Sequence, residues 1–188
     1  MAEEIRDKQT ILARFRDATR RLAGALDRLD DDAMLAPNAV GEWSLRDTLS
    51  HIANPWLAEQ LQSYLGGRAP DPLAATGTTE PPGPEFDLTT NDGRNAWRQS
   101  VRAGESLNVV RTRYVEFVAS MERLIEAFPD EDFERSFAIH FGDFVGVVRP
   151  AQEGEPGFPL WQWLRGDTWH HVEDHLPAFE AAADARGR

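Results

Sequence analysis

The sequence contains no cysteine, which excludes disulfide bridges, thiolate metal sites and cysteine nucleophiles. It also lacks any apolar run near the roughly 18 residues that cross a bilayer. The first ten residues, MAEEIRDKQT, are charged and have none of the apolar core of a secretory signal. These absences predict a protein of the cytoplasm with no membrane partner.

Positive charge is scarce as well, because 20 Lys and Arg stand against 32 Asp and Glu and the net charge is −12. A surface of that sign repels polyanions, so nucleic acid is not expected as a partner. Apolar side chains, in contrast, make up 41% of the 188 residues. That supply is enough to bury the core of one domain, which we expect to cover residues 1–188.

Apolar residues recur three or four positions apart over most of the chain, which is the period of an amphipathic helix. The pattern predicts helices over residues 4–30, 44–65, 106–128 and 160–183, and a shorter one near Asp92. Pro55 predicts a kink in the second helix, because proline has no amide hydrogen and clashes with the carbonyl four residues earlier. Residues 136–148 predict one short strand pair. The expected fold class is therefore all-α, as a four-helix bundle with one long crossover connection.

The crossover is the segment 66–90, which contains five prolines and is too long for a tight loop. Two interpretations stay open. The segment is either a strap that runs along the bundle, or a lid that opens at low free-energy cost and covers a site.

Histidines provide the main functional signal, and His171 and His175 lie four residues apart in the last predicted helix. At that spacing both rings project from one face, which suits sharing a metal ion. A helical wheel places them on the core side and turns His170 away. Catalytic metal sites usually have three protein ligands, so His51 in the second helix is the natural third. The alternative is that these are hydrogen-bonded core histidines without a metal.

Two segments around these histidines resemble a known family. Residues 41–53, GEWSLRDTLSHIA, resemble the second-helix signature of the DinB-like metalloenzyme superfamily, with Asp three and His seven positions after the Ser. Residues 166–180, GDTWHHVEDHLPAFE, resemble its last-helix motif in the form found in the ClbS/DfsB branch. In that motif Thr, two residues, His, three residues, His and Leu follow one another, and here they are Thr168, His171, His175 and Leu176.

The resemblance implies a DinB-like four-helix bundle that holds one divalent metal ion, zinc, nickel or iron, with His51, His171 and His175. It also implies hydrolases, or transferases that use a low-molecular-weight thiol, acting on a small-molecule substrate. Because the chain has no cysteine, any thiol must come from a cosubstrate. Asp47 and Asp167, each four residues before a histidine, are expected to accept the second ring proton of a ligand.

A non-catalytic alternative stays open beside the enzyme. In it, the histidines are vestigial and the bundle sequesters an apolar small molecule, or confers self-resistance, through a pocket lined by Trp43, Trp56, Trp161 and Trp163. A third interpretation is a bundle that works by forming a homodimer. Metal content separates the enzyme from the other two.

Overall fold

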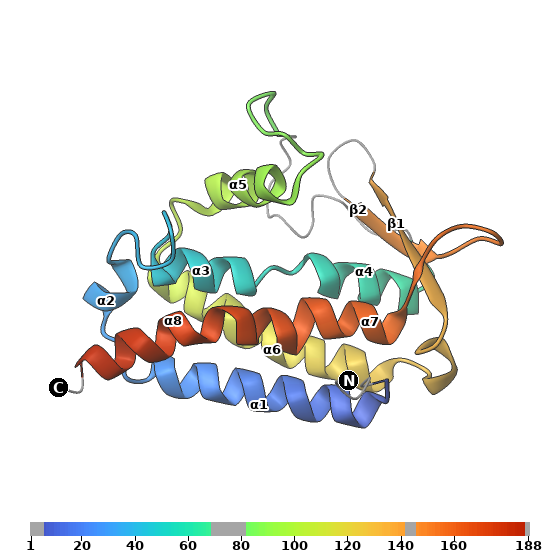
Figure 1. Ribbon diagram of the computed structural model, residues 1–188, viewed down its shortest axis with the longest axis horizontal. Coiled ribbons are helices and arrows are strands. Elements are labelled where there is room, and N and C mark those ends of the chain that lie inside the picture. The colour runs from blue at the N-terminus through green and yellow to red at the C-terminus, as the bar shows by residue number, and fades with distance from the viewer. Residues whose placement is uncertain (1–5, 69–81, 142–145, 187–188) are drawn as a thin grey trace.

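Helices carry most of the chain in the computed structural model, which describes residues 6–68, 82–141 and 146–186 (Figure 1). They are α1 (Lys8–Leu26), α2 (Asp31–Leu35), α3 (Leu45–Ile52), α4 (Trp56–Leu65), α5 (Asn91–Arg102), α6 (Leu107–Ala127), α7 (Leu160–Arg165) and α8 (His171–Arg186). The predicted helical class is confirmed. None of the described helices is long and apolar enough to cross a membrane.

A small antiparallel sheet accompanies the helices, in the order β2-β1-β3. Its strands are β1 (Ser136–Phe141), β2 (Gly146–Pro150) and β3 (Phe158–Pro159). The predicted strand pair is confirmed by β1 and β2, whereas β3 was missed because two residues are too short to show an alternating pattern. Gln60 of α4 ties the sheet to the helices, since its side-chain oxygen accepts a 2.9 Å hydrogen bond from the Val148 amide.

The apolar core lies between α1, α6, the α3–α4 pair and the α7–α8 pair, which run along the longest dimension of the molecule (Figure 1). Its fully buried side chains include Ile11, Phe15, Leu22, Leu49, Met121, Ile125 and Phe179. α5 packs against α3 on the side away from α1 (Figure 1). The outer face of α3 is therefore covered by a second helix, and a site at the end of α3 can be lined from both.

The helix predicted over residues 44–65 is wrong in one respect, because it is two helices and not one kinked helix. α3 ends at Ile52 and α4 begins at Trp56, whose amide donates a 3.1 Å hydrogen bond to the Asn54 side chain. In a continuous helix Pro55 could not donate to the carbonyl of His51, and its ring would clash with that carbonyl, so the helix breaks here. The break places His51 in the last turn of α3, next to an irregular stretch, where its side chain is partly buried.

The segment between α1 and α3 contains the short helix α2, for which the apolar pattern predicts no helix. Asp30 begins it, with a side-chain oxygen that accepts a 2.8 Å hydrogen bond from the Ala33 amide. The sequence signal was the run of three aspartates, which favours a helix N-terminus through capping and the helix dipole. The open question about residues 66–90 lies largely outside the described residues, since 69–81 are not among them.

The start of α3 is held by a capping box, as the Ser44–Asp47 spacing predicts. The Ser44 hydroxyl accepts a 3.1 Å bond from the Asp47 amide, and an Asp47 carboxylate oxygen accepts a 3.1 Å bond from the Ser44 amide. Replacing Ser44 by alanine is expected to lower the free energy of unfolding by about 1 kcal/mol. Urea unfolding measures this. Ser100→Ala, at an exposed position of α5, is the control and should change stability little, and an equal loss there would contradict the capping explanation.

Candidate metal centre

Three imidazoles converge where the end of α3 meets the beginning of α8. His51 comes from the last turn of α3, His171 begins α8, and His175 lies one turn further along α8. One ring nitrogen from each lies within 4.8 Å of the others. The Nε2 atoms of His51 and His171 are 2.8 Å apart. The structure thus brings together all three residues that the sequence singled out.

The register of α8 explains why His171 and His175 lie at the edge of the core. The fully buried face of α8 consists of Val172, Leu176, Phe179 and Ala183, so each histidine precedes a core residue by one position and is partly exposed. The helical wheel placed both histidines on the core side because it assumed one continuous α-helix from residue 160. A π-helical segment, η2 (Gly166–His170), interrupts that helix and shifts the register.

Burial keeps these imidazoles neutral. Loss of solvent lowers the pKa of His51 to about 3 and of His171 to about 4, and mutual repulsion with the neighbouring histidines adds to the effect. The pKa of His175 is also lowered, again by burial. A neutral imidazole offers a free lone pair, and a divalent metal requires its ligands in that form.

The donor set fits a divalent ion in number, type and spacing. Metal–nitrogen bonds of about 2.0–2.1 Å place two ligand nitrogens of one tetrahedral ion about 3.3 Å apart. The 2.8 Å His51–His171 separation and the 4.8 Å limit of the cluster bracket that value. Three nitrogen ligands leave one position of such an ion for water or substrate.

Of the neighbouring polar residues, His170 and Asp47 do not contribute to the cluster, whereas Asp167 lies close to it. His170 is exposed and its Nδ1 lies 3.1 Å from the Asp174 carboxylate, so it points away from the cluster as the wheel predicted. Asp47 does not have the expected role beside His51. Its carboxylate accepts hydrogen bonds from Ser44 and Arg46. Asp167 does lie near the cluster, because it lines the same cavity as His51 and His171.

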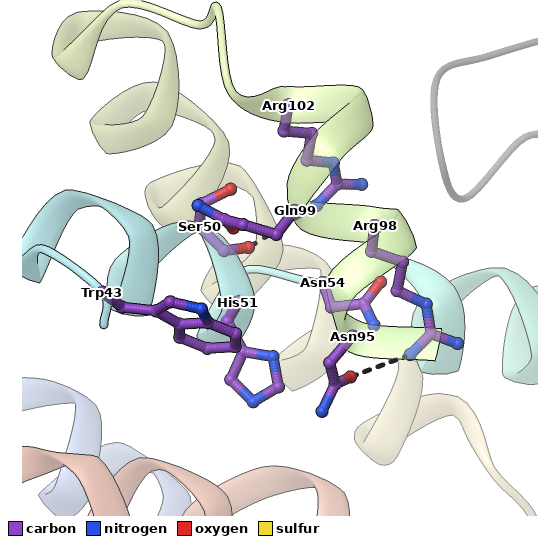
Figure 2. Close-up of a pocket in the computed structure, with 8 residues that line it drawn as sticks. All are labelled: Trp43, Ser50, His51, Asn54, Asn95, Arg98, Gln99 and Arg102. Atoms are coloured by element: carbon purple, nitrogen blue, oxygen red, sulfur yellow. Dashed lines mark hydrogen bonds between the residues drawn. The ribbon is translucent and has the colours of Figure 1, made fainter. Parts of the chain in front are cut away.

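That cavity has a volume of about 370 Å³ and opens beside the histidines. Its walls come from α3, α4, α5, β1, α7, η2, the start of α8 and the stretch between α3 and α4. They consist of His51, Asn54, Trp56, Asn91, Arg94, Asn95, Arg98, Ile139, Trp163, Gly166, Asp167 and His171. A hollow of about 10 Å³, the space of one water molecule, also borders His51 and lies between Trp43 and α5 (Figure 2). We refer to the larger cavity as the cleft.

Within the cleft, burial raises the pKa of the Asp167 carboxyl to about 6, and the positive charge of Arg98 partly offsets that rise. A carboxyl with this pKa exchanges protons near neutral pH, which suits a general acid or base. The arginines of α5 were not identified from the sequence. Their signal was the spacing of Arg94, Arg98 and Arg102, which at four-residue intervals share one helix face.

The four tryptophans predicted to line one pocket do not all lie at the same place. Trp56 and Trp163 line the cleft, with ring centroids 6.2 Å apart, and Trp43 lies 5.1 Å from the His51 ring. Trp161 faces elsewhere, since its ring is covered by the Arg6 guanidinium and its Nε1 donates to Glu134. Three of the four therefore border the histidine cluster or its cleft.

Comparison with models of known protein families shows to which family the chain belongs. The model of the DinB superfamily matches residues 14–155, about three quarters of the sequence. The chain belongs to the DinB superfamily. The DinB match includes His51 and ends before His171 and His175, so the resemblance of the last helix rests on its own motif. No curated protein matches the chain significantly.

Two solved structures have the same DinB-like fold. One, a protein of Streptococcus pneumoniae, has a TM-score of 0.67 at 11% identity, and the similarity covers 96% of this chain and 92% of that one. The other, an uncharacterised protein of Escherichia coli UTI89, has a TM-score of 0.66 at 13% identity and covers 97% and 96%. At these identities the likeness concerns the fold alone.

Proposed function

We propose that this DinB-superfamily protein is a metal-dependent enzyme that holds one divalent ion, zinc, nickel or iron, with His51, His171 and His175. The reaction is hydrolysis of a small molecule, or transfer to it of a low-molecular-weight thiol. The observation that carries the proposal is the convergence of three neutral imidazoles within 4.8 Å of one another, two of which, those of His51 and His171, line a cleft large enough for a substrate.

The residues around the ion would transfer protons and exclude water from the substrate. When bound, the ion would act as a Lewis acid and lower the pKa of a water or thiol into the neutral range. The Asp167 carboxyl, with its pKa of about 6, would accept or return a proton at its carboxylate oxygen. Trp56 and Trp163 would exclude water from one side of the substrate.

Stoichiometric metal is the first expected result. Protein purified without a His tag and without chelator should carry close to one divalent ion per chain, measured by elemental analysis. The same protein stripped with chelator should take up one equivalent when zinc, nickel or iron is returned. Protein that is isolated without metal and refuses all three ions would overturn the proposal.

A second function is favoured by one specific contact. The 2.8 Å bond between His51 and His171 lets the two rings satisfy each other as donor and acceptor without an ion. The non-catalytic alternative, a small-molecule binding or self-resistance bundle with vestigial histidines, is consistent with that contact. Metal content separates the two functions, because only the first needs an ion.

The finer classification belongs to the same proposal. The four rows of helices around one core support a DinB-like four-helix bundle that forms a single domain over residues 1–188. The spacing of Thr168, His171, His175 and Leu176 supports the ClbS/DfsB branch. We further propose a cytoplasmic protein with a small-molecule substrate and no nucleic-acid partner, which forms a homodimer.

A further inference from the structure

Positive charge is concentrated on one side of the cleft, in a chain whose net charge is −12. Arg94 and Arg98, one turn apart on α5, line the cleft together with His51 and His171. Arg98 also lines the hollow beside His51, and Arg102 lies one turn further along the same face (Figure 2). Among the described residues that line the cleft, Asp167 is the one acidic side chain, and burial disfavours its charge, so the balance of charge there favours a ligand of negative sign.

The three arginines differ in how far the protein itself satisfies them. Arg94 donates to the Leu88 carbonyl and to Asn91, and Arg102 donates to the Ser50 carbonyl. Arg98 has a single long hydrogen bond of 3.5 Å, to the Asn95 side chain (Figure 2). Its Nε is buried and has no hydrogen-bond partner among the described residues. Buried polar groups are nearly always hydrogen-bonded, so the weakly satisfied guanidinium of Arg98 has hydrogen-bonding capacity left for a ligand in the cleft.

The charge on Arg98 is costly in the cleft, and a bound anion would stabilise it. Burial lowers the pKa of Arg98, and repulsion by Arg94 lowers it further. Burial likewise lowers the pKa of Arg102 to about 10, with Arg113 adding to the effect. Asp167 attracts Arg98 across the cleft, yet burial also disfavours its own charge. An anion that neutralises Arg98 would offset the cost of burying its charge.

The cleft also has an apolar part. Trp56 and Trp163 line it with their rings tilted 41° to each other, and Ile139 lines it as well. Flat aromatic surface favours a planar or apolar body, which it binds by burial and offset stacking. The volume of about 370 Å³ is within the range of small-molecule sites.

We propose that the cleft recognises an organic anion, whose carboxylate or phosphate group is bound by Arg98 and whose planar apolar body packs against Trp56 and Trp163. The inference deepens the proposed function, on which it rests for taking the cleft beside the histidines as the substrate site. The fork of the guanidinium matches either anionic group, since carboxylate and phosphate both accept two parallel N–H bonds.

Three probes of the same shape test the charge requirement: 2-naphthoate, 2-naphthyl phosphate and the neutral 2-naphthamide. Their dissociation constants for the full-length protein are measured by tryptophan fluorescence, before and after removal of metal with chelator. At least one anion is expected to bind about tenfold or more tightly than the amide in both forms, because hydrogen bonds to a charged group are the stronger kind. The two anion arms separate carboxylate from phosphate recognition. Equal affinities for all three probes would overturn the inference.

Arg98→Gln assigns the effect to one side chain. It is expected to weaken the preferred anion about tenfold and to leave the amide within about twofold, so unchanged amide binding also reports an intact fold. Arg123→Gln, on the exposed face of α6, removes the same charge away from the cleft and is the matched control. An anion preference that survives Arg98→Gln would contradict the assignment, and its loss in the control would show a non-specific charge effect.

Failure of this inference can be told from failure of the proposed function. Arg98 is not a metal ligand, so Arg98→Gln should retain one ion per chain. A protein that binds no metal yet selects the anion through Arg98 would overturn the enzyme and keep the anion site. A protein that binds one metal ion and shows no anion preference would overturn the anion site alone.

Discussion

His171→Ala is expected to reduce the affinity for a divalent ion by more than about 100-fold, since even indirect partners of metal ligands cost 10–100-fold when lost. His171 is central to the cluster because its Nε2 lies nearest to His51 and its ring centroid is 5.1 Å from that of His175. Its removal leaves two nitrogens from different helices, which is too few for a catalytic site. Activity that depends on the ion should fall with it. Competition with a coloured chelator measures the affinity.

The adjacent residue offers a matched control. His170→Ala removes the same side chain one position earlier, where the ring is exposed and lies against Asp174. It should change metal affinity by less than about twofold, because no ligand is lost. A large loss in His170→Ala together with retained binding in His171→Ala would show that the register of α8 differs from the one described.

The free energy of unfolding of the metal-free protein should fall as the solution is acidified, over a pH range set by the pKa values of His51 and His171. In the unfolded chain their pKa is about 6.5, whereas in the folded protein it is about 3 for His51 and about 4 for His171. Between pH 6.5 and 4 the unfolded state therefore binds protons that the folded state does not. The free energy of unfolding should fall, as pH falls, by about 1.4 kcal/mol per pH unit for each such histidine.

Urea unfolding of chelator-treated protein at pH 7, 6, 5 and 4.5 measures this dependence. Because carboxylates also titrate near the lower end, the reference is the double variant His51→Gln, His171→Gln, which keeps polar side chains that do not ionise. Its stability should fall much less steeply between pH 6.5 and 5. Parallel curves for the two proteins would contradict the depressed pKa values.

Much of the fold could be predicted because its signals are local. The apolar period of α6 runs uninterrupted from Leu107, and the structure follows it to Ala127. The Ser44–Asp47 spacing predicts the start of α3, and the Gly- and Pro-broken aromatic segment after Phe133 predicts the strand pair. In each case the residues that determine the element lie within a few positions of one another.

The site could be predicted in its residues but not in its surroundings. The three histidines were found through their spacing and motif, which are properties of the sequence. The role of α5 was not, because the meeting of Arg98 with His51 and Asp167 depends on how α5 packs over α3. The prediction that Asp47 accepts a ring proton of His51 was wrong for a related reason. The Asp47 side chain had a nearer partner at the helix start, and local hydrogen bonding to Ser44 prevailed over a contact with His51.

The π-helical segment η2 makes the three-histidine cluster depend on chain length as well as on residue identity. If one residue were deleted between Gly166 and His170, the segment could close into an ordinary α-helix, and everything after it would rotate by about 100° relative to α7. A chain of this kind would keep His51, His171 and His175 and still lose their convergence. Among related sequences, the number of residues between the tryptophans of α7 and the paired histidines is thus as informative about the site as the histidines themselves.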